Sequence, residues 1–205
     1  MKPHCSYLTT AALAFQILHS PAAVLYVDVN STNPAPPYAN WSAAATDMQS
    51  AIDSSSAGDL ILVTNGLYQT GGRVVYGSLT NRVVINKAVT VQSANGPGVT
   101  FIEGYQDTSN IVGDDAVRCV YLTNKAVLSG FTLTNGATRS DGDGMQEQSG
   151  GGVWCEFTNA VITNCVITGN EANNEGGGVV SGTLFNCTLS SNMAYGDGAA
   201  RPRAF

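Results

Sequence analysis

The sequence predicts an all-β protein in which short parallel strands stack as a solenoid, a parallel β-helix, with one α-helix capping its N-terminal end. The composition is the first observation: the 205 residues are only 12% charged and include 23 glycines, which is typical of many short strands and turns. The second is that short alternating apolar runs, each broken by Gly, Asn or Ser, follow one another from about residue 60 onward. The third is an internal repeat.

Three segments of the chain carry the same pattern of apolar residues. VLSGFTLTN begins at Val127, VITNCVITG at Val161 and TLFNCTLSS at Thr183, so the offsets between them are 34 and 22 residues. Units this short cannot bury an apolar face alone, and stacked units share one continuous core. Neighbouring parallel strands would then lie about 4.8 Å apart.

The alternation of side chains along each strand assigns residues to the two faces. We expect nine of them to point inward: Leu128, Phe131, Leu133, Ile162, Cys165, Ile167, Leu184, Cys187 and Leu189. Gly130, Asn164 and Asn186 occupy the same place in each unit, between two strands. A left-handed backbone is expected there, because Gly and Asn tolerate it best.

The repeat also accounts for the cysteines. Cys165 and Cys187 fill one inward column, and the strands VRC and VWC place Cys119 and Cys155 in another. Small apolar thiols are ordinary packing residues, so free thiols are expected. A disulfide between Cys165 and Cys187 is the alternative, because in-register neighbours lie within the range that a disulfide spans.

The N-terminal residues 1–23 are typical of a signal peptide. Lys2 stands before an apolar stretch that ends in small residues, as in segments that direct export. A buried N-terminal helix is the alternative. Export would place the protein outside the cell or on the cell surface.

Three further segments follow the predicted signal. Residues 24–58 comprise a strand, a Pro-rich connector and a helix over Ala43–Ser54 with Ser42 as its N-cap, since the apolar residues of this stretch share one helical face. Residues 59–200 form the rungs of the β-helix. Residues 201–205 are an irregular tail, and we expect further rungs to follow in a longer natural chain.

Charge and composition exclude several functions. The formal net charge is −6 and the nine Lys and Arg residues are scattered, which excludes nucleic-acid binding through a basic patch. After the signal no run approaches the ~18 apolar residues of a membrane-spanning helix. Both histidines, His4 and His19, lie in the predicted signal, so no zinc site is expected.

The block WSAAATDMQSAIDSSSAGDLILVTNGLYQ resembles the N-terminal cap and first rung of right-handed parallel β-helix proteins, the pectate-lyase-like superfamily. The matching residues are Ala51-Ile52, Gly58-Asp59, Ile61, Val63, Gly66 and Tyr68. The later GGGV and NC repeats are similar to bacterial secreted β-helix repeats, including those of polymorphic outer-membrane proteins. The likeness covers about residues 26–200. It implies a right-handed solenoid but no particular activity, since the superfamily includes lyases, hydrolases, adhesins and phage tailspikes.

The GDD sequence at residues 113–115 is the first candidate site. Asp114 and Asp115 resemble the paired aspartates of the superfamily's hydrolases, although the accompanying Asn-Thr-Asp and histidine motifs are missing. The alternative is an acidic turn before the next strand.

A loop inserted between Asn135 and Gly151 is the second candidate, because long loops on rigid scaffolds often carry function. Asp141, Asp143 and Glu147 in this loop offer oxygen ligands for Ca²⁺. Their spacing matches no complete calcium-loop pattern, so a solvated acidic loop is the alternative.

Arg118 and Trp154, with Glu156 nearby, form the third candidate. If Cys119 and Cys155 point inward, then Arg118 and Trp154 point outward from adjacent rungs. An exposed tryptophan beside an arginine suits the stacking of a sugar ring. The alternative is a surface pair covered by the long loop.

From these features we expect an exported or cell-surface β-helix protein, adhesive, glycan-binding or structural, that contacts a polysaccharide or cell-surface glycan and requires no cofactor. The alternative is a polysaccharide-active enzyme, a uronate lyase or a glycoside hydrolase, whose catalytic residues are divergent or lie beyond residue 205.

Overall fold

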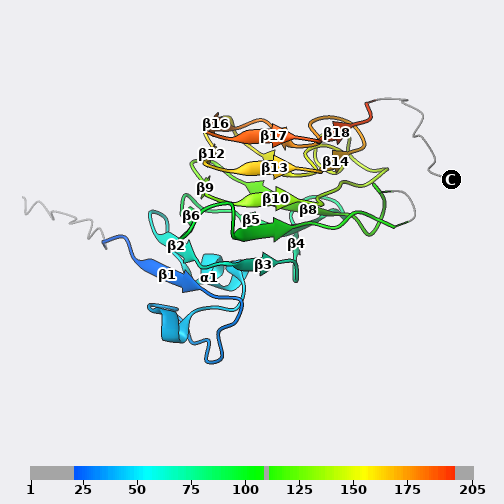
Figure 1. Ribbon diagram of the computed structural model, residues 1–205. Coiled ribbons are helices and arrows are strands. Elements are labelled where there is room, and N and C mark those ends of the chain that lie inside the picture. The colour runs from blue at the N-terminus through cyan, green and yellow to red at the C-terminus, as the bar shows by residue number, and fades with distance from the viewer. Residues whose placement is uncertain (1–20, 109–110, 197–205) are drawn as a thin grey trace, which may run out of the picture.

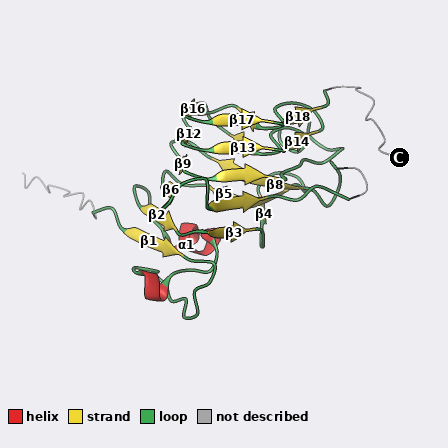
Figure 2. Ribbon diagram, in the orientation of Figure 1, coloured by secondary structure: helices red, strands yellow, loops and turns green. Residues whose placement is uncertain are grey.

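The structure is a computed structural model that describes residues 21–108 and 111–196 (Figure 1). The predicted signal peptide, apart from residues 21–23, and the tail at 201–205 lie outside the described residues. The described part consists almost entirely of strands and loops (Figure 2). No helix in this part is long and apolar enough to cross a membrane.

Three sheets run along the solenoid, and each turn of the chain, here called a rung, adds one strand to each sheet. The first sheet contains β1 (Val24–Val27), β2 (Leu60–Val63), β6 (Thr90–Ser93), β9 (Val127–Ser129), β12 (Val161–Thr163) and β16 (Thr183–Phe185). The second contains β3 (Gly66–Tyr68), β7 (Thr100–Glu103), β10 (Thr132–Thr134), β13 (Val166–Thr168) and β17 (Thr188–Ser190). The third contains β4 (Arg73–Val74), β5 (Thr80–Ile85), β8 (Val117–Leu122), β11 (Val153–Cys155) and β15 (Val179–Val180). Two short strands in the last rungs, β14 (Glu171–Ala172) and β18 (Met193–Ala194), pair with each other as a separate two-stranded sheet.

The strands within these sheets pair in parallel, with the exception of β4, which lies antiparallel to β5. The all-β parallel solenoid predicted from the repeat is therefore confirmed. Val161 of β12 pairs with Val127 on one side and with Thr183 on the other, which are the offsets of 34 and 22 residues read from the sequence.

The predicted inward residues form the core of the solenoid. Leu128, Phe131, Leu133, Ile162, Cys165 and Ile167 are buried. On the last described rung Leu184 and Cys187 are half-buried, and Leu189 is 49% exposed. Leu189 pairs in register with the buried Ile167, as the predicted inward column requires, and it is exposed because no described rung lies over it.

The bends between the first and second sheets match the prediction. Gly130, Asn164 and Asn186 have φ angles of 82°, 53° and 49°, in the left-handed region that Gly and Asn tolerate. The two asparagines also stack, since Nδ2 of Asn186 donates to Oδ1 of Asn164 at 2.7 Å. The side chains thus link neighbouring rungs outside the core.

One short α-helix, α1 (Met48–Ser54), covers the N-terminal end of the core. It begins later than predicted, because the Asp47 carboxylate accepts the Ser50 N–H at 2.8 Å and provides the N-cap. Ser42 is not the N-cap; it lies in a separate 3-10 turn, η1 (Trp41–Ala43).

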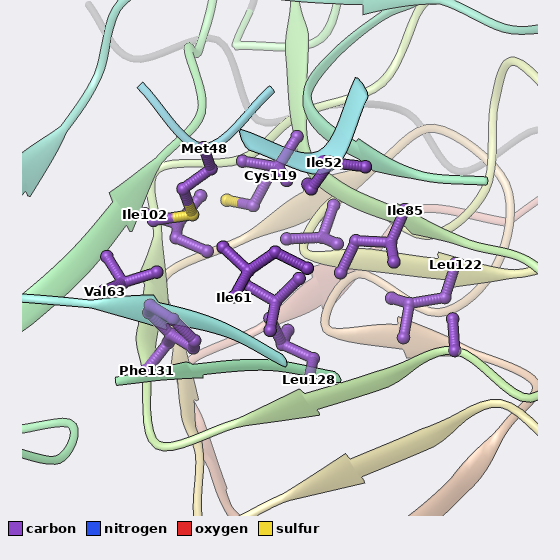
Figure 3. Close-up of a cluster of buried hydrophobic side chains, with 14 of the residues drawn as sticks. Met48, Ile52, Ile61, Val63, Ile85, Ile102, Cys119, Leu122, Leu128 and Phe131 are labelled. Carbon is purple, nitrogen blue, oxygen red and sulfur yellow. The ribbon is translucent and has the colours of Figure 1, made fainter. Parts of the chain in front are cut away.

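The helix buries its apolar face as the sequence predicted. Met48, Ala51 and Ile52 are buried in the same cluster as the strand residues. Figure 3 shows Met48 and Ile52 beside Ile61 and Ile85. The helix therefore closes the end of the solenoid at which β1 lies.

The four cysteines among the described residues are free thiols, as the packing interpretation predicted. Burial raises the pKa of Cys165 to about 11, which makes this thiol unreactive at neutral pH. The predicted common column of Cys119 and Cys155 was wrong, because Cys155 pairs with Leu122 instead. The sequence alignment matched VWC of β11 with VRC, the first half of the six-residue β8. In the structure VWC pairs with the second half, residues 120–122, so the register is shifted by three residues.

Candidate functional site

The long loop between β10 and β11 lies against the solenoid, and Arg118 of β8 holds it there. Arg118 is 2% exposed. Its guanidinium donates to the carbonyl oxygens of Gln146 at 2.7 Å, Ser149 at 2.8 Å and Gly150 at 2.9 Å, and to Oδ1 of Asn81 at 2.8 Å. Burial lowers the pKa of Arg118 to about 9, which still leaves the side chain charged at neutral pH.

This arrangement corrects the sequence prediction for Arg118. The side chain is covered by the long loop, as in the alternative, and offers no exposed face to a sugar. It also pairs with Asn81 of β5, whereas Trp154 pairs with Tyr121. Arg118 fixes the position of the loop that carries the predicted acidic residues.

Glu147, one of the predicted calcium ligands, joins the loop to the segment before β5. Its carboxylate accepts the backbone N–H of Ser78 at 2.7 Å and that of Asp143 at 3.0 Å. These two hydrogen bonds hold the pKa of Glu147 below its ordinary value. The side chain is only 8% exposed, so its main contacts are within the fold.

The other two predicted ligands also contact the loop itself. Asp143 accepts the backbone N–H groups of Met145 at 3.0 Å and Gln146 at 2.7 Å, and Asp141 forms an ion pair with Arg139 at 2.6 Å. Among residues 21–108 and 111–196, no three His, Cys, Asp or Glu side chains are grouped to hold a metal ion. Calcium binding at Asp141, Asp143 and Glu147 stays a prediction.

Arg139 connects the two acidic candidates that the sequence analysis treated separately. Its guanidinium lies 2.8 Å from the carboxylate of Asp114 and 2.6 Å from that of Asp141, and it approaches Glu147 at 3.7 Å. Asp114 and Asp115 are exposed on the turn before β8, where the acidic-turn alternative put them. Sequence reasoning missed Arg139, although a lone arginine beside an acidic loop is a recognisable signal.

Trp154 lies on the outer face of the third sheet, as predicted, but it is covered. Its ring stacks on Tyr121 at 5.7 Å and meets Tyr76 edge-on at 5.8 Å, and only 7% of the residue is exposed. Arg118 lies 5.7 Å from the ring centroid. The segment that contains Val75 and Tyr76 packs over the tryptophan, so the expected exposed stacking surface is not present.

Glu156 anchors this aromatic cover. Its carboxylate accepts hydrogen bonds from the hydroxyls of Tyr76 and Tyr121, both at 2.6 Å, and from Thr123 at 3.0 Å. Burial alone would raise the pKa of Glu156, but these hydrogen bonds outweigh it and lower the pKa. The predicted third candidate is thus a closed aromatic cluster with a carboxylate at its edge.

A cavity of about 290 Å³ lies elsewhere, beside the start of α1. Its polar and aromatic lining residues are Thr46, Asp47, Gln49, Tyr68, Thr70 and Arg82 of β5. The sequence analysis did not identify this site. The one available signal was a charged residue directly before the apolar run VVI.

The charge of Arg82 is the distinctive feature of the cavity. The guanidinium donates to the backbone carbonyl oxygens of Glu103 at 2.8 Å and Gly104 at 3.3 Å, and to that of Gly71. Within the described residues it has no carboxylate partner within 4.0 Å. Burial lowers the pKa of Arg82, and the nearby charge of Glu103 opposes this shift without cancelling it.

The chain was compared with protein-family models, curated proteins and solved structures, and none of them matches it. The fold is therefore established by the structure alone. The protein is a parallel β-solenoid, and its membership of the pectate-lyase-like superfamily stays a prediction from the sequence.

Proposed function

We propose that the protein is an exported or cell-surface β-solenoid with an adhesive or structural role, and that it binds a glycan in the cavity beside α1. The observation that carries the proposal is the guanidinium of Arg82 on the cavity wall, charged and without a carboxylate partner among the described residues. The predicted signal peptide supports the location.

The lining of the cavity suits a sugar. Carbohydrate rings present hydroxyls at their edges and an apolar face, and proteins bind them with aromatic rings and a few hydrogen-bonding groups. Here Tyr68 offers a ring, and Thr46, Thr70 and Gln49 offer polar groups. A volume of about 290 Å³ accommodates one residue of a glycan chain.

The arginine favours an acidic sugar. A guanidinium binds carboxylates through two parallel hydrogen bonds, and it does so more strongly where water is partly excluded. Arg82 uses three of its five N–H groups on backbone carbonyls. The remaining two are available to a carboxylate, so the preferred ligand is a uronic acid within a polysaccharide.

The acidic candidates favour binding over catalysis. Asp114 and Asp141 are paired with Arg139, and Glu147 accepts two backbone hydrogen bonds. Each of these contacts supports the loop. Asp114 and Asp115 are exposed, so a substrate could reach them. The assay below therefore also measures product formation, which tests the enzyme alternative.

The experiment measures binding of polygalacturonate and alginate, with and without Ca²⁺, by isothermal titration calorimetry, with a neutral glucan for comparison. Reducing ends and the absorbance of unsaturated uronates report any turnover. We expect binding without turnover in the wild-type protein, and loss of binding in Arg82→Gln and in Thr70→Trp, which puts a large side chain at a residue that lines the cavity.

Arg73→Gln is the matched control, because Arg73 is on the surface and outside the cavity lining. Circular dichroism melts confirm that each variant is folded. If no acidic glycan binds, or if Thr70→Trp binds as well as the wild type, the glycan site is wrong. Product formation that is abolished by Asp114→Asn or Asp115→Asn would establish the enzyme instead.

A further inference from the structure

Asp59, directly before β2, is a buried carboxylate at the N-terminal end of the solenoid. Only 7% of the residue is exposed. One carboxylate oxygen accepts the backbone N–H of Ala23 at 2.8 Å, and the other accepts that of Ser56 at 2.7 Å. Ala23 also extends the pairing of β1 with β2, because its carbonyl accepts the Leu60 N–H at 2.9 Å. The carboxylate therefore lies against the residue that directly precedes β1.

The negative charge of Asp59 has no cation beside it. Its two hydrogen-bond donors are neutral amides, and within residues 21–108 and 111–196 no Lys, Arg or His nitrogen lies within 4.0 Å of the carboxylate. The ammonium of Lys87 binds the Ser55 carbonyl at 2.7 Å, which is the opposite side of the peptide unit that Asp59 contacts. A buried carboxylate is costly unless a cation compensates it. A positive charge on the Ala23 nitrogen would supply that compensation.

This nitrogen belongs to the peptide bond at which the predicted signal peptide would be cut. Export signals are cut after a small residue, with a second small residue two positions earlier. Ala22 and Ser20 meet this requirement for the bond between Ala22 and Ala23. A cut one bond later would put Pro21 at the earlier position. The sequence requirement and the contact with Asp59 therefore select the same bond.

We propose that a signal peptidase hydrolyses the bond between Ala22 and Ala23 during export, and that the new α-ammonium of Ala23 forms an ion pair with Asp59 in the mature protein. Water is the co-reactant. Its oxygen is added to the carbonyl carbon of Ala22, which becomes a carboxylate on the released signal, and both of its protons end on the Ala23 nitrogen. The inference rests on the export that is part of the proposed function.

The cut changes the contact with Asp59 from a neutral hydrogen bond to a charge-assisted one. An ammonium donates to a carboxylate more strongly than an amide does. Because Asp59 also accepts the Ser56 N–H, shortly after the end of α1, the ion pair joins the start of β1 to β2 and to the residues that follow the helix. Processing thus completes the N-terminal cap of the solenoid.

The first experiment exports the full 205-residue chain from a bacterial host and measures the intact mass of the protein recovered outside the cytoplasm. We expect a chain of residues 23–205. Ala22→Tyr should abolish this product, and Pro21→Tyr is the matched control, since the position between the two small residues is unrestricted. An exported chain that begins at another residue would overturn the inference and leave the exported location standing. A chain that stays uncut in the cytoplasm would overturn both.

The second experiment tests the ion pair in chains that are produced with a defined first residue. Only the uncharged amine reacts with acetic anhydride, and a facing carboxylate raises the pKa of an α-amino group above that of an ordinary chain end. In the chain that begins at Ala23, acylation of this group at about pH 7 should be about 10-fold slower than in its Asp59→Asn variant, as followed by peptide mass spectrometry. A chain that begins at Ser20 keeps Asp59 but moves the ammonium three residues away, and it should react as fast as the variant.

Circular dichroism establishes that each of these chains is folded. The chain that begins at Ser20 provides the comparison if Asp59→Asn does not fold. Equal acylation rates in the chains that begin at Ala23 and at Ser20 would overturn the ion pair, even where the cut is found at the expected bond.

Discussion

Asn170 provides the most demanding test of the interior of the solenoid. Its side chain is fully buried. Oδ1 accepts the Gly136 N–H at 2.9 Å, and Nδ2 donates to the carbonyl of Leu133 and to Oδ1 of Asn192, both at 3.0 Å. The side chain therefore ties three successive rungs together from within the core.

The cost of Asn170→Ala follows from the groups that lose their partners. The Gly136 N–H and the Leu133 carbonyl would be left buried without these hydrogen bonds, and each such group costs about 1–3 kcal/mol. We expect the free energy of unfolding to fall by roughly 2–6 kcal/mol. That is a large share of the roughly 5–15 kcal/mol by which domains are stable.

The assay is urea unfolding followed by circular dichroism and tryptophan fluorescence. The control is Asn159→Ala, because Asn159 donates to Asn124 at 2.6 Å in an exposed position, and a surface change of this kind costs about 0.5 kcal/mol or less. Equal effects at Asn170 and Asn159 would refute the role of the buried asparagine, as would a loss below about 1 kcal/mol at Asn170.

Three further predictions test other parts of the fold. Lys87→Met removes an ammonium that donates to three carbonyl oxygens at the end of α1, at 2.7 to 2.9 Å, and urea unfolding should show a loss of about 1–2 kcal/mol; an unchanged midpoint would contradict this. Gly136→Ala puts a Cβ 2.2 Å from a backbone carbonyl oxygen and should lower Tm in a thermal melt, whereas Gly98→Ala meets nothing within 4 Å and should not. Glu147 has a pKa lowered below 4.5 in the folded state, so its contribution to stability is complete above its unfolded pKa and is lost as the pH falls through the folded one. Glu147→Gln should therefore flatten the dependence of the urea midpoint on pH in acid, and parallel profiles would contradict that.

The architecture was predictable because it depends on local periodicity. The period of two along each strand and the offsets between units place Leu128, Ile162 and Leu184 in one column, and the structure pairs them in register. The bends at Asn164 and Asn186 were predictable for a similar reason, since few residue types tolerate a left-handed backbone.

The candidate site was less predictable, because it depends on contacts between distant segments. Trp154 is covered by Tyr76, and Arg118 by backbone carbonyls of the long loop. Neither contact follows from alternation along a strand. The start of α1 was misplaced because two side chains, Ser42 and Asp47, are both suitable N-caps, and the choice depends on how the preceding chain binds β1.

Cross-linking of engineered cysteines tests the central claim, the stacking of rungs in register. Ser129 and Thr163 pair on adjacent rungs, and Phe185 pairs with Thr163 on the rung beyond. Neighbouring Cα atoms lie about 4.8 Å apart and those two rungs apart about 9.6 Å, whereas a disulfide spans less than about 7 Å. The measurement is the yield of intramolecular disulfide under mild oxidation, read by mass spectrometry after alkylation. The account predicts a high yield for Ser129→Cys with Thr163→Cys and none for Ser129→Cys with Phe185→Cys; the opposite order, or equal yields, would contradict it.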